Sequence, residues 1–186
     1  MTELLNDPHH TAIHEASHAV VARVLTLACG QATIVPDYVA GEAGHSITEE
    51  PSTCEYEWEK RGKVRDSENA IWHARIMSFM AGAEGEVVLL GSTQCGDGDD
   101  RYQIELMAEY LEGRESWSRI EPRLRAMTRT LVRRHRALIE RVATALIERK
   151  TLSREELDKL IGRSVDDVKI NAPFLLAMHR ARPLRS

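Results

Sequence analysis

The chain has few cysteines and no long apolar run, and each shortage argues against a class of protein. Its three cysteines, Cys29, Cys54 and Cys95, are an odd number at wide spacing, which is not the pattern of a disulfide framework or of a clustered thiolate zinc site. The longest apolar stretch, residues 19–29, is interrupted by polar residues and is shorter than the roughly 20 residues that span a bilayer. We therefore expect reduced thiols and no membrane span.

The first ten residues also lack the basic start, apolar run and small-residue cleavage site of a secretory signal, so we expect a cytoplasmic protein. What the chain does contain is typical of one globular domain: 186 residues, of which 42% are apolar and 29% charged. A fold of this length buries about 70% of the surface that its unfolded chain exposes. A core can therefore form without a structural metal, which leaves a bound metal free for chemistry.

Helical periodicity dominates the sequence and predicts a mainly α fold with a small two- to three-stranded β edge element. Asp7-Pro8 is typical of a helix start, and Ser153-Arg-Glu-Glu156 is a capping box before a last short helix. The polar stretch 49–69 is interpreted as a surface loop and 163–186 as a C-terminal extension. The predicted helices cover residues 8–29, 70–90, 118–150 and 153–162. A further helix, before residue 118, is expected to begin with Asp99 or Asp100 as its N-cap. The predicted strands cover residues 32–36 and 44–48.

His14-Glu15-Ala16-Ser17-His18 forms an HExxH pattern inside the first predicted helix. Four residues at about 100° each bring the two imidazoles to one face, one turn apart, where both can reach one ion at roughly 2.0–2.1 Å. Glu15 lies beside that face, where it can take a proton from water that the metal activates. The pattern predicts a zinc hydrolase with Glu15 as its general base.

A catalytic zinc site has three protein ligands and an open position for water, so a third ligand must come from elsewhere. The extended pattern HExxHxxGxxH is absent, because positions 21 and 24 are both valine. A glutamate from the following helix or an aspartate from the acidic loop 96–100 could complete the site. The residues with suitable donor atoms are Asp97, Asp99, Asp100, Glu84, Glu86, Cys95, His45, His73, His135 and His179.

Five blocks of sequence, in a fixed order within residues 11–161, together resemble one known family. The family is the FtsH family of zinc metalloproteases. In order, the blocks are similar to its HEAGHA(V/L)VA helix, the strand beside its substrate groove, its GGRAAEE(I/L)xxG helix, its TGASND segment and its closing helices. The corresponding blocks here are 14–22, 33–36, 80–91, 96–100 and 137–157.

The resemblance implies a single FtsH-peptidase-like domain over 1–186 and a zinc metalloendopeptidase that cleaves unfolded or flexible polypeptides. It assigns His14 and His18 as zinc ligands, Asp100 as the third ligand and Glu15 as the general base. Glu86 matches the first glutamate of AAEE and becomes the partner that orients a ligand, or a fallback ligand. An extended substrate is expected to pair with an edge strand around residues 33–35.

The chain also departs from the family. It has no GxxxxGK(S/T) loop, so we expect it to be independent of ATP by itself, and a separate ATPase or partner protein would have to unfold a folded substrate. Family members form rings through this domain, so a homo-oligomer is a further expectation. Ser17 replaces the glycine of the pattern, on the side of the helix that we predict to face away from the ion.

Charge is divided unevenly along the chain. Residues 1–100 carry 6 Lys and Arg against 17 Asp and Glu, a net −11, whereas residues 101–186 carry 19 against 12, a net +7. The basic run 129–136 is interpreted as a solvated helix face, or a face that docks an acidic partner, and not as a nucleic-acid site, because a binding motif and interleaved aromatics are missing. The alternative function is therefore a non-cleaving, zinc-containing binding or assembly module that uses this basic helix, although the intact Glu15 argues against it.

Overall fold

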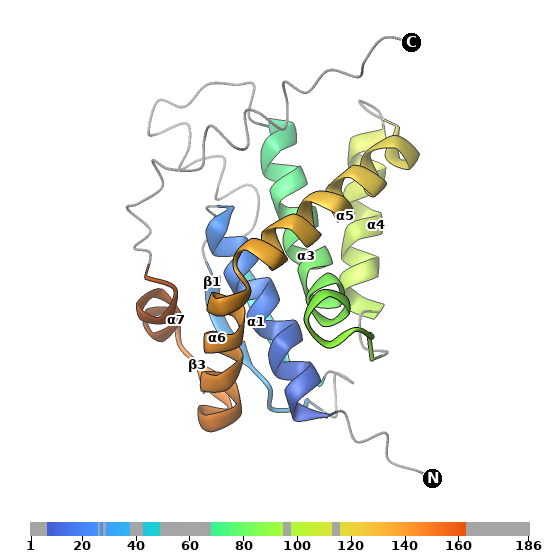
Figure 1. Ribbon diagram of the computed structural model, residues 1–186. Coiled ribbons are helices and arrows are strands. Elements are labelled where there is room, and N and C mark those ends of the chain that lie inside the picture. The colour runs from blue at the N-terminus through green and yellow to red at the C-terminus, as the bar shows by residue number, and fades with distance from the viewer. Residues whose placement is uncertain are drawn as a thin grey trace.

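The computed structural model describes residues 7–25, 27, 29–37, 43–48, 68–94, 98–112 and 116–162. Within these ranges the chain forms helices packed around one central helix, with a small three-stranded sheet against that helix (Figure 1). The predicted fold class, mainly α with a small β element, is confirmed. In the described part of the chain no helix combines the length and the apolar character that crossing a bilayer requires. Most of the predicted loop 49–69 and all of the extension 163–186 lie outside the described residues.

The central helix is α1, Pro8–Val24. The Asp7 side chain accepts a hydrogen bond from the backbone N–H of His9 at 3.0 Å, which caps the helix start as predicted. Nearly every residue from position 11 to 24 is buried, so the helix is covered on all sides, mostly through small and apolar side chains but also through Glu15, His18 and Arg23. It ends at Leu25 and not near Cys29 as predicted, because the backbone from Cys29 onward hydrogen-bonds to two neighbouring strands.

The sheet has the order β2-β1-β3, and both pairs are antiparallel. The strands are β1 (Cys29–Thr33), β2 (His45–Thr48) and β3 (Thr151–Leu152). The predicted pair is present, but its first strand begins earlier and ends before Pro36, whose missing N–H therefore does not interrupt the ladder. The two residues of β3 were not predicted, because a strand so short has no periodicity to detect.

The pairing of Thr33 shows that the strand expected to bind the substrate has no open edge at this residue. Thr33 is opposite His45 on one side and Thr151 on the other, so β1 is the central strand and has no open edge there. The backbone N–H of Ile34 also donates to the carbonyl of Lys150, at 2.9 Å. The prediction that a substrate pairs with residues 33–35 is therefore wrong. In the described part of the chain β2 pairs with β1 alone.

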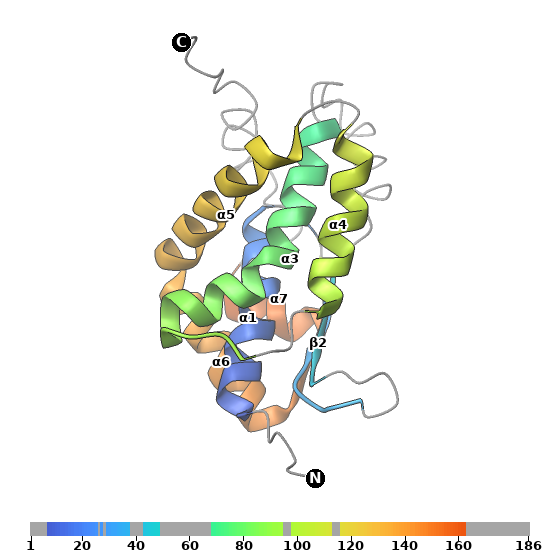
Figure 2. The same cartoon turned by 90° about the vertical axis from the view of Figure 1, so that its right-hand side faces the viewer.

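Two helices bring the remaining site residues to α1. Helix α3 (Glu68–Leu90) packs along α1, and α4 (Gly98–Glu112) packs on α3 (Figure 2). Asp99 and Asp100 lie in the first turn of α4 and not at its N-cap as predicted, because the helix already begins at Gly98.

The predicted helix 118–150 is two helices, α5 (Trp117–Arg134) and α6 (Arg136–Arg149), with a break at His135. Helix α5 packs on α3 and α6 packs on α1, and Figure 1 shows the change of direction between them. One straight helix could not follow both surfaces. The last helix, α7 (Arg154–Ile161), has the predicted capping box at Ser153 and ends at Gly162, whose φ of 71° is the left-handed conformation that glycine favours.

Candidate metal centre

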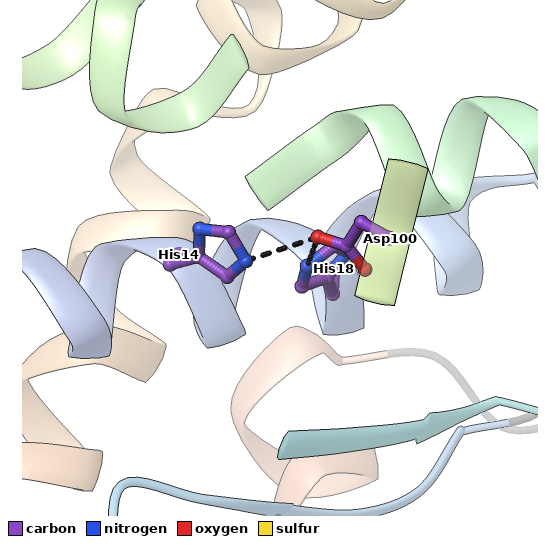
Figure 3. Close-up of side chains that lie close together, drawn as sticks. All are labelled: His14, His18 and Asp100. Atoms are coloured by element: carbon purple, nitrogen blue, oxygen red, sulfur yellow. Dashed lines mark hydrogen bonds and ion pairs between the residues drawn. The ribbon is translucent and has the colours of Figure 1, made fainter. Parts of the chain in front are cut away.

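Three predicted ligands meet at one place. The side chains of His14 and His18 come from α1 and that of Asp100 from the first turn of α4 (Figure 3). The Oδ2 atom of Asp100 is 3.1 Å from Nε2 of His14 and 3.1 Å from Nε2 of His18. One ligand atom from each residue lies within 4.8 Å of the other two, and no other group of three such side chains is found in the described residues. Two imidazoles and one carboxylate are a donor set that catalytic zinc accepts.

The other nitrogen of each imidazole has a fixed acceptor. Nδ1 of His14 lies 2.7 Å from Oε1 of Glu86, and Nδ1 of His18 lies 2.6 Å from the backbone carbonyl of Ser78. Both acceptors are oxygens without a proton, so each Nδ1 carries the hydrogen and donates it. When the two imidazoles are neutral, as metal binding requires, the Nε2 lone pair of each is thereby directed at the shared position near Asp100.

Glu86 orients His14 and is not one of the clustered donor atoms. Its side chain is 4% exposed, and its Oε2 lies 3.2 Å from Nδ1 of His10 and accepts the backbone N–H of Gln94 at 2.7 Å. Burial by itself would raise the pKa of this carboxyl, but the hydrogen bonds from His14, Gln94 and His10 lower it. Of the two roles expected for Glu86, the geometry favours the orienting one.

Gly82 of α3 provides the space in front of the two imidazoles. A Cβ atom at this position would overlap with Nε2 of His14 and would be 2.5 Å from Nε2 of His18. Glycine inside a helix is unfavourable by roughly 1 kcal/mol relative to alanine, so it needs a reason. The reason here is that any larger residue would fill the space into which both nitrogens point.

The electrostatics of the cluster favour a positive charge. Burial opposes charging of His14, but the hydrogen bonds with Asp100 and Glu86 raise its pKa to about 10. The pKa of His18 is also raised: burial again lowers it, and the charge of Asp100 more than compensates. Burial raises the pKa of Asp100, but the two histidines lower it well below its usual value. The negative charges of Asp100 and Glu86, which favour protonation of the histidines here, would also attract a metal cation.

Glu15 is buried next to the cluster, with 5% of its surface exposed. Burial raises the pKa of its carboxyl, and the negative charge of Asp100 adds to this, while His18 and His14 act in the opposite direction. The segment before β2 lies against it: a Cβ on Gly44 would be 3.3 Å from Cγ of Glu15. Glu15 therefore lies beside the cluster, where the general base of an HExxH site is expected.

Glu84, a candidate third ligand, has a different role. Its buried carboxylate accepts from Nε of Arg129 at 2.5 Å and from Nη1 of Arg125 at 3.4 Å, both on α5. Arg129 pairs with Glu84 at the α3–α5 contact but is itself exposed, as the predicted solvated basic face requires. Arg133 and Arg134 are exposed, in agreement with that prediction.

The other candidate ligands do not join the cluster. Asp99, His45, His73 and His135 are described but are not part of the group formed by His14, His18 and Asp100. Asp97, Cys95 and His179 lie outside the described residues.

Three contributors to the site were not predicted from the sequence. Ser78 acts through its backbone carbonyl, for which no side-chain pattern exists. Gly82 was detectable as a glycine within a predicted helix, and His10 as a third histidine at four-residue spacing on α1. Ser17, predicted to face away from the ion, is fully buried against α3 at Gly85.

Comparisons with known proteins add no family to this geometry. No protein-family model matches the chain, and no curated protein matches it either.

Proposed function

We propose that the protein is a zinc-dependent endopeptidase of the FtsH type, with His14, His18 and Asp100 as ligands and Glu15 as the general base. The observation that carries the proposal is the convergence of both Nε2 atoms of an HExxH helix on a carboxylate oxygen from another helix. The resemblance over residues 11–161 supports the reaction class, since it names the same three ligands and the same base.

The residues divide the chemistry among them. Zinc held here would act as a Lewis acid and lower the pKa of water toward about 7. Glu15 takes the proton from the attacking water and returns it to the leaving amine of the peptide. Glu86 and the Ser78 carbonyl keep His14 and His18 in the tautomer that binds metal, and Gly82 keeps the space open.

An extended polypeptide is the substrate class that the sheet favours. Strand β2 is an edge strand among the described residues, and Gly44 immediately before it lies against Glu15. A peptide that added to the outer edge of β2 would run past the general base, with its backbone held by strand hydrogen bonds. Such pairing needs an unfolded or flexible chain, because a folded substrate has no free backbone of that length to offer.

The test compares the parent with Glu15→Gln, which keeps the size of the side chain but removes the base. We expect one zinc per chain in both proteins by metal analysis. Cleavage of casein, an unfolded protein, should fall by about 10²- to 10⁴-fold in Glu15→Gln, the usual contribution of a general base. Glu105→Gln, an exposed glutamate on α4, is the matched control and should cleave like the parent.

Three outcomes would contradict the proposal in different ways. Equal cleavage by the parent and Glu15→Gln would remove Glu15 from the mechanism. Stoichiometric zinc without cleavage of any unfolded polypeptide would favour the non-cleaving binding module. A parent protein that purifies without zinc and takes up none would contradict the metal centre itself.

A further inference from the structure

We propose that His10 is a positioning residue of the metal centre, which acts on His14 through Glu86. The inference rests on the proposed function, since it concerns the same centre. His10, His14 and His18 occur at four-residue intervals on α1 and share one face of that helix. His10 is not among the clustered donors, but its Nδ1 lies 3.2 Å from Oε2 of Glu86.

Glu86 can orient His14 only while its own carboxylate is fixed. A buried carboxylate needs a donor for each oxygen, and rotation about its last bond exchanges the two oxygens. Oε1 is held by Nδ1 of His14 at 2.7 Å, and Oε2 is held from the other side by His10 and by the backbone N–H of Gln94. The His10 bond therefore acts together with the Gln94 N–H to keep Oε1 aligned with His14.

The same contacts connect His10 to the segment that leads to Asp100. The Gln94 side-chain oxygen accepts the backbone N–H of Asp7 at 3.3 Å, and Asp7 in turn caps α1 through His9. The start of α1 and the chain that follows α3 are thus joined around Glu86. Without His10, Oε2 would keep the Gln94 N–H alone among the described partners, and the carboxylate would be held less firmly.

His9 provides a matched control for His10. It is the adjacent histidine in the same turn of α1, but it is exposed, and only its backbone N–H takes part in the helix cap. Replacing the His9 side chain should therefore leave both the cap and the metal centre intact.

The experiment measures the affinity for Zn²⁺ by competition with a chelator. We expect His10→Ala to weaken zinc binding by about 3- to 10-fold, less than the 10- to 100-fold that is usual when a direct partner of a ligand is lost. His10→Asn, whose amide N–H₂ can donate from nearly the position of Nδ1, should bind like the parent. His9→Ala should also bind like the parent.

A double-mutant cycle separates positioning from a general structural role. If His10 acts through Glu86, then His10→Ala combined with Glu86→Gln should bind zinc no more weakly than Glu86→Gln alone. Unfolding of the metal-free proteins shows that the variants are folded. If His10→Ala is too unstable, His10→Leu keeps the bulk of the side chain without a donor and takes its place.

The outcomes distinguish this inference from the proposed function. A parent that binds zinc while the donor-free His10 variant binds equally tightly would overturn the role of His10 alone. Additive losses in the double mutant, or no recovery in His10→Asn, would overturn it as well. A parent that binds no zinc would overturn both proposals.

Discussion

Gly82 shows how one missing side chain can decide whether a metal site exists. Its Cα faces the two imidazoles so closely that an alanine methyl would occupy the space between their Nε2 atoms. Gly98, at the start of α4, is the natural comparison, because a Cβ there would meet nothing within 4 Å. The two glycines therefore separate the effect on the site from the effect of alanine on a helix.

We predict that Gly82→Ala loses zinc while it keeps its helical structure. Alanine is favoured over glycine in a helix by roughly 1 kcal/mol, so the change should not weaken α3 through propensity. Zinc affinity should fall by more than about tenfold, since the methyl group displaces either the ion or an imidazole. Isothermal titration with zinc, with circular dichroism as the check on folding, measures both. Gly98→Ala should titrate like the parent, and full affinity in Gly82→Ala would contradict the geometry.

The charge of Glu86 should strengthen the metal centre through His14. Glu86→Gln keeps an oxygen that can accept from His14 but removes the negative charge that makes the imidazole a stronger ligand. Zinc affinity should fall by about 10- to 100-fold. Chelator competition measures the loss, and Glu109→Gln, an exposed glutamate on α4, is the control. If both variants bound zinc equally, Glu86 would be a structural residue only.

Ser17 shows how a departure from the pattern that the chain resembles is accommodated. The pattern has glycine at this position and alanine at the one that matches Gly85, whereas this chain has serine and glycine. A Cβ on Gly85 would overlap with the hydroxyl of Ser17, which instead donates to the carbonyl of Ile13 at 2.7 Å. The side chain of Ser17 lies in the space that a side chain at Gly85 would fill, so α1 and α3 still pack closely.

At the scale of elements, the success of the sequence predictions depended on how local the signal was. The start of α1 and the capping box of α7 were predicted because Asp7, Pro8, Ser153 and Glu156 act within one turn. The break at His135 was missed because it depends on the surfaces of α1 and α3, which α6 and α5 must follow separately. Tertiary contacts, which periodicity does not contain, set such boundaries.

The candidate site was predictable to a similar extent. Helical spacing alone placed His14 and His18 together, whereas the position of Asp100 beside them depends on the path of the chain after α3. Residue spacing left ten candidate third ligands, and only the resemblance to a family selected Asp100. The sheet edge was mistaken because the partner of Thr33 in β3 lies more than a hundred residues further along the chain.

Glu84 provides a prediction about how the helices are held. Its carboxylate joins α3 to α5 through Arg129 and Arg125, and both arginines are partly exposed, so solvent weakens each pair. Glu84→Gln should lower the free energy of unfolding by about 1 kcal/mol. Zinc affinity should remain that of the parent. Denaturant unfolding of the metal-free protein measures the stability, and a zinc titration measures the affinity. A loss of zinc binding in Glu84→Gln would indicate that Glu84 takes part in holding the metal.

For the whole molecule, the metal is expected to join segments that are far apart in the sequence. His14 and His18 belong to the central helix and Asp100 to α4, which otherwise packs mainly on α3. Because the unfolded chain does not hold these donors together, zinc should stabilise the folded state by about 2.7 kcal/mol at a concentration 100-fold above its dissociation constant.

This stabilisation is measurable as a shift of the melting temperature. For a chain of this size we expect an increase of about 5–10 °C on addition of zinc, and its reversal by a chelator. Asp100→Asn is the informative variant, because it is nearly isosteric but provides a weaker ligand, and its shift should be much smaller. An equal shift in Asp100→Asn would place the stabilising zinc elsewhere.

The most direct test of the metal centre is a crystal structure of the zinc-loaded protein with anomalous diffraction recorded on both sides of the zinc absorption edge. We predict one strong peak, bonded to Nε2 of His14, Nε2 of His18 and a carboxylate oxygen of Asp100 at about 2.0–2.2 Å, and close to Gly82. A peak bonded to other residues, or no peak at these three side chains in fully loaded crystals, would contradict the account.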